Sequence, residues 1–338
     1  MAIGAHHGPL DEQVREGWVE ALEQNAAFER PWVDEAAAWL LAGPVAATPL
    51  PGPAVDVGAG AGGAAIAFAH RLASPDSGGA TDGEVTHGGA SSGRPLEAAG
   101  RLGGDGGAGG NDPADGGDPA VAPVVAVDRD PRLLALARRF AEAEGVAERI
   151  RFEEGAIGDL PVEPESAGLV WASGVVHHIA DQQAAIEELA GLLAPGGTLA
   201  IGEGGLPLRC LPFEIGVGRP GLESRLDDAR SRWFTDLRAE LHGPPLPYGW
   251  PAALARAGLA DVRSRSFLVE ATPPLDESGR RVALLHLTSA RQELAGYLAD
   301  DDRETVERLL DESGPHWVGA RDDLVVTAVR TVNAATRP

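Results

Sequence analysis

The chain has 338 residues and a formal net charge of −23 at pH 7. This negative charge argues against a nucleic-acid groove or an anionic membrane surface as a partner, because both attract clustered cations. The single cysteine, Cys210, excludes an internal disulfide and a cysteine-built zinc site, and the absence of lysine excludes a lysine Schiff base. With no apolar run near membrane-spanning length and no signal-peptide core, we expect a soluble cytoplasmic protein without a membrane partner.

The chain begins with a helical pattern over residues 10–42, before a proline-rich link at 44–53. Proline inside a helix removes a backbone donor, so we predict two helices divided at Arg30-Pro31. Residues 1–50 then form an N-terminal helical unit. Its tryptophans fall among apolar positions, where they could pack as core: Trp18, Trp32 and Trp39.

A glycine-rich segment follows at residues 55–63, which read VDVGAGAGG. Alternating apolar residues predict a short strand, the glycines a tight turn, and the small residues after them a helix. A turn without bulky side chains lets a nucleotide-like ligand lie against backbone N–H groups at the helix start. The string satisfies both GxGxxG and GxGxG, and it is also compatible with an ordinary strand–helix turn.

The second strand is predicted at 123–128 and ends in Asp128, where a carboxylate can accept both hydroxyls of a ribose. In nucleotide-binding folds this acid lies about 20 residues beyond the glycines. Here Asp128 follows Gly63 by 65 residues, because the glycine-rich stretch 74–120 intervenes. That stretch has too few apolar residues to form a core, so we predict a disordered insertion. Without it the spacing would be about 18 residues, close to the usual value.

Strands and helices alternate as far as residue 205, which predicts an α/β core over 51–205 with a doubly wound, Rossmann-like parallel sheet. The remaining chain, 206–338, adds helices and two further strands, and we predict a helical cap above the strand tips. Such a cap either lines a substrate pocket or has a purely structural role. The predicted core strands are 54–58, 123–128, 150–154, 169–173 and 198–203, with helices at 62–72, 131–144 and 181–193; the later helices are 219–241, 248–258, 277–299 and 302–312, with strands at 261–270 and 324–329.

Five motifs occur in order along the core: VDVGAGAGG (55–63), AVDRD (126–130), EEGAIGDLP (153–161), LVWASGVVHHI (169–179) and LLAPGGTLAIGEGG (192–205). Together they resemble the motifs of class I S-adenosylmethionine-dependent methyltransferases of the small-molecule type. The resemblance implies S-adenosylmethionine as cofactor, N-terminal helices that fold over it as a lid, and a mostly parallel sheet whose last strand is antiparallel.

The resemblance also implies a role for each matching position. The glycine turn would lie against the methionine and ribose portion, with Asp56 ordering its polar end, and Asp128 would bind the ribose. Arg129 would flank the adenine, which Ala156 and Ile157 would bound, while Ala172 and Ser173 would face the sulfonium. The turn positions are Gly58, Ala59, Gly60 and Gly62. The chain departs from the family at Ala156 and Gly168, where acidic residues are usual.

Methyl transfer is a direct displacement, so catalysis depends mainly on alignment, and a general base is needed only for an alcohol or phenol acceptor. The base candidates after the fourth and fifth strands are His177, His178 and Glu203. In the family a histidine at the second of the two positions is commonly structural. No HExxH-like spacing occurs, so we expect no metal. Weaker candidates lie in the cap: His242, Tyr248 and His316.

The function expected from these features is methyl transfer from S-adenosylmethionine to a small, apolar or aromatic acceptor of the kind found in specialised metabolism. Two other readings stay open. One is a methyltransferase-like protein that binds a ligand or partner without turnover, since fold does not fix function. The other is an NAD-dependent oxidoreductase, which the glycine pattern alone would also allow. The acceptor atom and the oligomeric state are not determined by the sequence.

Overall fold

A computed structural model describes residues 12–42, 50–73 and 123–338. The predicted insertion at 74–120 and the side chain of Trp18 lie outside the described residues. The described chain forms a seven-stranded sheet in the order β3-β2-β1-β4-β5-β7-β6. The strands are β1 (Ala54–Val57), β2 (Val124–Asp128), β3 (Ile150–Glu154), β4 (Ala167–Ser173), β5 (Leu193–Arg209), β6 (Ala260–Ala271) and β7 (Val326–Thr336).

The sheet has the predicted mixture of directions. Strands β1 to β5 pair in parallel, whereas β7 runs antiparallel to both β5 and β6. In the register, Val57 lies opposite both Val127 and Ala172. The residues that follow these three positions therefore meet at one edge of the sheet, which brings Gly58, Asp128 and Ser173 together.

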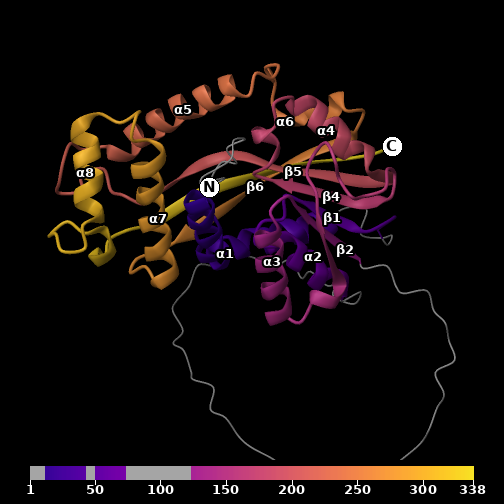
Figure 1. The fold of residues 1–338 in the computed structure, drawn as a ribbon, viewed down its shortest axis with the longest axis horizontal. Coiled ribbons are helices and arrows are strands. Elements are labelled where there is room, and N and C mark those ends of the chain that lie inside the picture. Colours follow the sequence, from indigo (N-terminus) through magenta and orange to yellow (C-terminus); the bar gives the residue numbers. More distant parts are fainter. Residues whose placement is uncertain (1–11, 43–49, 74–122) are drawn as a thin grey trace, which may run out of the picture. The chain divides into compact units, whose positions relative to one another are not determined.

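Helices cover both faces of the sheet (Figure 1). Alternation along β1 separates the two faces, since Ala54 belongs to the core with α1 and α2, and Val55 and Val57 belong to the core with α4 and α6. This three-layer packing is the doubly wound architecture that the sequence predicts. The helices bounding the central sheet are α1 (Glu12–Leu41), α2 (Gly63–Ala73), α3 (Pro131–Ala143), α4 (Gln182–Gly191) and α6 (Trp250–Arg256).

The N-terminal segment is one helix, so the predicted division at Arg30-Pro31 is wrong. Helix α1 runs from Glu12 to Leu41 with Pro31 inside it. A proline removes one helical hydrogen bond, but tertiary packing holds the turns on both sides. The Trp32 ring lies 6.0 Å from that of Trp171 and 6.4 Å from that of Phe267, centroid to centroid. These aromatic contacts anchor the helix to the sheet across the proline.

Several element boundaries also differ from the sequence prediction. Strand β5 continues to Arg209 and β7 spans Val326–Thr336, whereas apolar runs predicted 198–203 and 324–329. The extra length of β5 pairs with β7 through two register shifts. These extensions contain glycine and polar residues, so the hydrophobic pattern of the sequence does not predict them as strands. They form strands because they pair with the neighbouring strand.

The departure at Gly168 has a packing cause. A Cβ at Gly168 would lie 2.6 Å from the carbonyl oxygen of Gly52, and one at Gly52 would lie 1.8 Å from the carbonyl oxygen of Ser166. The Gly168 N–H also donates to the Pro53 carbonyl at 2.9 Å. The segment leading into β1 thus crosses β4 at backbone contact, which leaves no space for the aspartate usual in the family.

The rest of the chain adds further helices, which are called the cap helices below. Helix α5 lies beyond the C-terminal part of β5 (Figure 1). Helices α7 and α8 pack against each other near the end of α5 that is distant from α6. Helix α7 ends at Glu293, earlier than the predicted residue 299. Among the described helices, none has the length and apolar character needed to cross a bilayer. The cap helices are α5 (Leu222–Glu240), α7 (Glu277–Glu293) and α8 (Asp300–Leu310).

Candidate functional site

The turn after β1 uses its glycines for different purposes. Gly58, Gly60 and Gly62 all have positive φ, at 71°, 54° and 79°, a region that L side chains rarely adopt. A Cβ at Gly58 would lie 2.3 Å from Val175 Cγ2, so this glycine lets the turn after β4 approach closely. At Gly60 the nearest described atom to such a Cβ is Leu22 Cδ1, 3.9 Å away. The middle of the turn therefore lies in van der Waals range of α1 and is less crowded than Gly58.

Two buried carboxylates flank this turn. Asp56 Oδ2 accepts the Ala65 N–H at 3.0 Å, at the start of α2. Asp128 accepts the Gly60 N–H through Oδ2 and the Asp130 N–H through Oδ1, each at 2.9 Å. Each of these oxygens keeps a second lone pair. The structure thus brings together the turn and Asp128, as the sequence predicts, across the long gap between them.

Burial changes the ionisation of both acids. Desolvation, with a smaller contribution from the charge of Asp128, raises the pKa of Asp56 to about 7 despite the opposing hydrogen bond from Ala65. Desolvation also raises the pKa of Asp128, while the backbone donors at Asp130 and Gly60 oppose the shift. Such carboxylates favour a ligand that brings positive charge or hydroxyl donors to them.

Residues expected around an adenine lie on the neighbouring loop. Ala156 forms an isolated antiparallel bridge with Asp159 and is exposed, while Ile157 is half-buried against the core beside α4. The Gly158 N–H donates to Glu188 Oε1 on α4 at 2.7 Å. Arg129 is exposed beside Asp128. The backbone of this loop is thus held in place although it lacks the usual acid.

The turn after β4 is built on the buried side chain of Glu203. Its Oε1 accepts the N–H groups of Val175 and Val176, each at 2.9 Å, and Oε2 lies 2.7 Å from His177 Nδ1. The carboxylate is therefore engaged on both oxygens, which favours a positioning role over that of a free base. With Nδ1 donating to Glu203, Nε2 of a neutral His177 is the nitrogen that can accept a proton.

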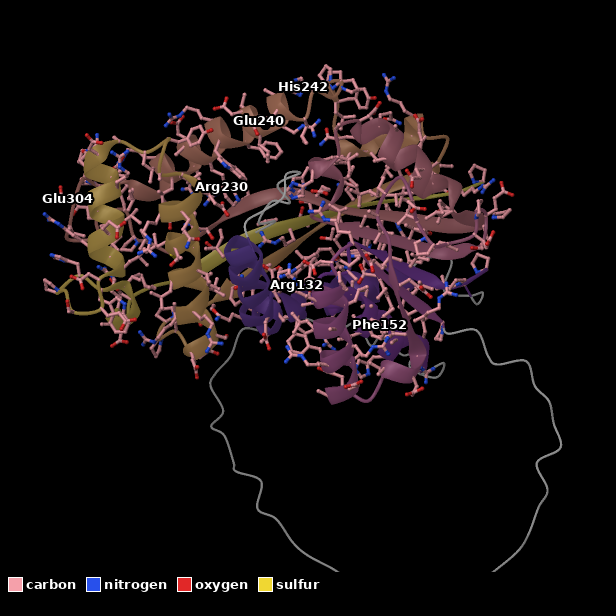
Figure 2. The ribbon with its side chains drawn as sticks, viewed as in Figure 1. Arg132, Phe152, Arg230, Glu240, His242 and Glu304 are labelled. Atoms are coloured by element: carbon pink, nitrogen blue, oxygen red, sulfur yellow. The ribbon has the colours of Figure 1, made fainter. Side chains whose placement is uncertain are left out.

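The remaining predicted residues occupy distinct environments. Ala172 is buried, and Ser173 donates its hydroxyl to the Gly202 carbonyl at 3.1 Å. His178 is buried with its ring centroid 3.8 Å from that of His177, consistent with a structural role. His242 is exposed beside Glu240 at the C-terminal end of α5 (Figure 2).

The weaker cap candidates do not join the His177–Glu203 pair in a described contact. The Tyr248 hydroxyl donates to Gln183 on α4 at 3.1 Å, and His316 is half-buried after α8. The structure therefore leaves His177 as the best-placed base candidate.

Arg238 of α5 is a further site residue that the sequence analysis missed. Its guanidinium donates to the carbonyls of His177, Ile179 and Ala180 at 3.1, 2.7 and 3.0 Å. On the same helix, Phe234 places its ring centroid 5.8 Å from that of His177. These contacts fasten the cap helix to the turn after β4, and no sequence motif signals them.

Known proteins show similarity to part of this chain. Residues 105–201 match a family model described as "Methyltransferase domain". The arsenite methyltransferase of Halobacterium salinarum is 35% identical over 80 residues, which cover 24% of this chain and 20% of that protein. The demethylmenaquinone methyltransferase of Thermus thermophilus is 39% identical over 80 residues, covering 24% of this chain and 36% of that protein.

The curated relatives are therefore matched over a minor part of their own length. Among solved structures, a putative methyltransferase from Bacillus halodurans shows 14% identity and a TM-score of 0.45, with 89% of this chain and 98% of that chain covered. The similarity of this chain to methyltransferases thus rests on the family model over residues 105–201 and on these partial matches.

The anchoring of the turn by Glu203 predicts different effects for two substitutions. Glu203→Ala leaves the part-buried N–H of Val175 and the buried N–H of Val176 without their acceptor and should lower the free energy of unfolding by about 2–5 kcal/mol. Glu203→Gln keeps an acceptor oxygen and should lose clearly less. Urea denaturation measures both, with the exposed Glu304→Ala as a surface control expected within about 0.5 kcal/mol of the parent. An alanine variant as stable as the parent would show that the carboxylate does not hold the turn.

Proposed function

We propose that this protein transfers a methyl group from S-adenosylmethionine to a small-molecule acceptor. The observation that carries the proposal is the glycine turn held between Asp56 and Asp128, at the edge where β1, β2 and β4 end. Ligands of doubly wound sheets bind at this carboxyl edge. The matched arsenite and demethylmenaquinone methyltransferases act on unlike acceptors by name, so they support the reaction type more than the substrate.

The residues present fit the cofactor. A Cβ at Gly60 would have only Leu22 Cδ1 within 4 Å among the described atoms, and the spare lone pairs of Asp128 can accept ribose hydroxyls. Asp56 would order the amino-acid end, with Gly58, Ala59 and Gly62 shaping the turn below it. Helix α1 reaches the same turn through Leu22, which supports a lid role for the N-terminal helix. Arg129, Ala156 and Ile157 would surround the base, and Ala172 and Ser173 the sulfur.

When bound, the cofactor supplies a methyl group on a cationic sulfur. The protein's task is to align the acceptor with that carbon. Glu203 fixes the turn that carries His177 and orients its ring, and Arg238 fastens α5 over the same turn. For a hydroxyl acceptor, His177 Nε2 would take the proton as the new bond to carbon forms and the bond to sulfur breaks.

The extended part of the sheet offers apolar surface for the acceptor. Leu206 on β5 and Leu268 on β6 both lie opposite Val329 of β7 and are 64% and 59% exposed. This row begins three residues beyond Glu203, on the same strand. Together with Phe234 beside His177, it supports an apolar or aromatic acceptor, in line with the sequence-based expectation.

Binding and turnover are separate questions with separate tests. Release of S-adenosylhomocysteine with a panel of hydroxyl, amine and carbon acceptors distinguishes an enzyme from a protein that binds the cofactor without turnover. Because the contact with Gly52 explains why residue 168 is glycine, this departure from the family does not argue for a protein that binds without turnover. Titration with NAD in the same calorimeter tests the oxidoreductase reading, and preference for NAD would overturn our proposal.

Asp128→Ala should weaken S-adenosylmethionine binding by about 1.5–3 kcal/mol, because the ribose would lose charge-assisted hydrogen bonds. Isothermal titration calorimetry measures the change, with Asp300→Ala as a control at a side chain 93% exposed on α8. An unchanged affinity in Asp128→Ala would contradict the ribose assignment. Absence of binding by the parent at millimolar cofactor would contradict the proposal as a whole.

Cofactor affinity should also depend on pH through Asp56. Its pKa of about 7 leaves it mostly protonated at pH 6, so affinity for a cationic ligand should rise by roughly five- to tenfold between pH 6 and 7.5. Asp56→Asn should flatten this profile in calorimetric titrations. Without ligand the sign is opposite: the folded state holds the proton more tightly, so Asp56 makes the free energy of unfolding fall as pH rises from about 4 to 7. A parent profile that Asp56→Asn leaves unaltered would contradict the assignment.

A further inference from the structure

A second group of ionisable side chains lies inside the helical cap. Cys210 follows the end of β5, Glu223 is in the first turn of α5, and His286 is in the middle of α7. One ligand atom from each lies within 4.8 Å of the other two, and the three residues are 3%, 6% and 1% exposed. The described His177–Glu203 pair belongs to the turn after β4, so this group is a separate feature of the fold.

We propose that Cys210, Glu223 and His286 bind one divalent transition-metal ion, with zinc as the best match. A thiolate, a carboxylate and an imidazole are the side chains that bind zinc in proteins. Thiolate and carboxylate together carry two negative charges, so a divalent ion would leave the buried site neutral. Tetrahedral zinc places its ligand atoms roughly 3.5 Å apart, which requires only a small contraction of the cluster.

The surroundings of the cluster support this assignment. Glu223 Oε1 accepts the N–H groups of Cys210 and Leu211 at 2.7 and 2.9 Å, which fixes the carboxylate in the way that outer hydrogen bonds orient metal ligands. Glu223 Oε2 lies 3.1 Å from His286 Nε2. Within the described residues, His286 Nδ1 is buried without a hydrogen-bond partner. If the three side chains only hydrogen-bonded to one another, the free-energy cost of burying His286 Nδ1 without a partner would not be offset.

A bound metal ion would displace the thiol proton to solvent as the sulfur–metal bond forms. The ion would then join β5, α5 and α7, three elements distant in sequence.

The sequence rules for metal sites do not detect this arrangement. They rely on close spacing or on several cysteines, whereas these ligands lie 13 and 63 positions apart and include the chain's single cysteine. The expectation of no metal, drawn from those rules, therefore does not address a site assembled by the fold. The proposal concerns the cap and is independent of the proposed methyl transfer.

Cobalt provides a direct test, because a cobalt–thiolate bond gives a charge-transfer absorption band and Cys210 is the single thiol. The full chain is freed of metal with a chelator, then titrated with Co²⁺ both in the native state and during refolding, since all three ligands are buried. We expect one equivalent to bind with the charge-transfer band, and zinc to displace it. Cys210→Ser should remove the band, and His286→Gln and Glu223→Gln should each weaken binding by more than about tenfold.

His316→Gln is the matched control, since this histidine lies outside the cluster, and it should keep the band and the stoichiometry. Circular dichroism identifies any ligand variant that fails to fold. Cobalt binding by the remaining folded ligand variants then tests the proposal. Absence of the band in folded parent protein at saturating cobalt would overturn the proposal. Equal cobalt binding by the parent and by folded Cys210→Ser would overturn it too.

Discussion

The close contact between two turns organises the site of this protein. The turn after β1 meets the turn after β4 where a Cβ at Gly58 would collide with Val175. On the other side, the buried carboxylate of Glu203 accepts the N–H groups of Val175 and Val176. Because neither contact can relax without moving the other, the glycine turn, His177 and the tips of three strands are held in one arrangement.

The cap depends on the same contact. Arg238 binds three carbonyls of the turn that Glu203 holds, so α5 is positioned by the core and not only by its own packing. Preorganisation of this kind would serve the proposed displacement reaction, in which alignment of the reacting atoms can supply much of the acceleration. A change in α5 would therefore be expected to reach the reacting groups through the backbone of residues 177–180.

Sequence reasoning succeeded where the signal was local. The glycines after Val57 and the acid after Val127 each announce the end of a buried strand, and parallel pairing then brings Gly60 and Asp128 to 2.9 Å despite their distance along the chain. It failed where tertiary contacts override a local rule. Pro31 suggested a break, but Trp32 packing against Trp171 keeps α1 continuous.

Other features had no local signal. Arg238 and the cap cluster around Cys210 consist of residues whose role arises only after distant elements pack together. Glu203 was identified as a candidate base because it was placed just after the fifth predicted strand, whereas it lies inside β5 with both its oxygens engaged. Residue identity and strand position could locate that carboxylate, whereas its hydrogen-bond partners could be known only from the folded chain.

The central claim is that the turn after Val57 holds the amino-acid end of a sulfonium donor while Asp128 binds its ribose. A crystal structure of the protein with S-adenosylhomocysteine tests this most directly. The account predicts the ligand across Gly58–Gly62, with its ribose hydroxyls on the Asp128 carboxylate and its sulfur near Ser173. A ligand bound elsewhere, with the glycine turn covered by side chains, would contradict it.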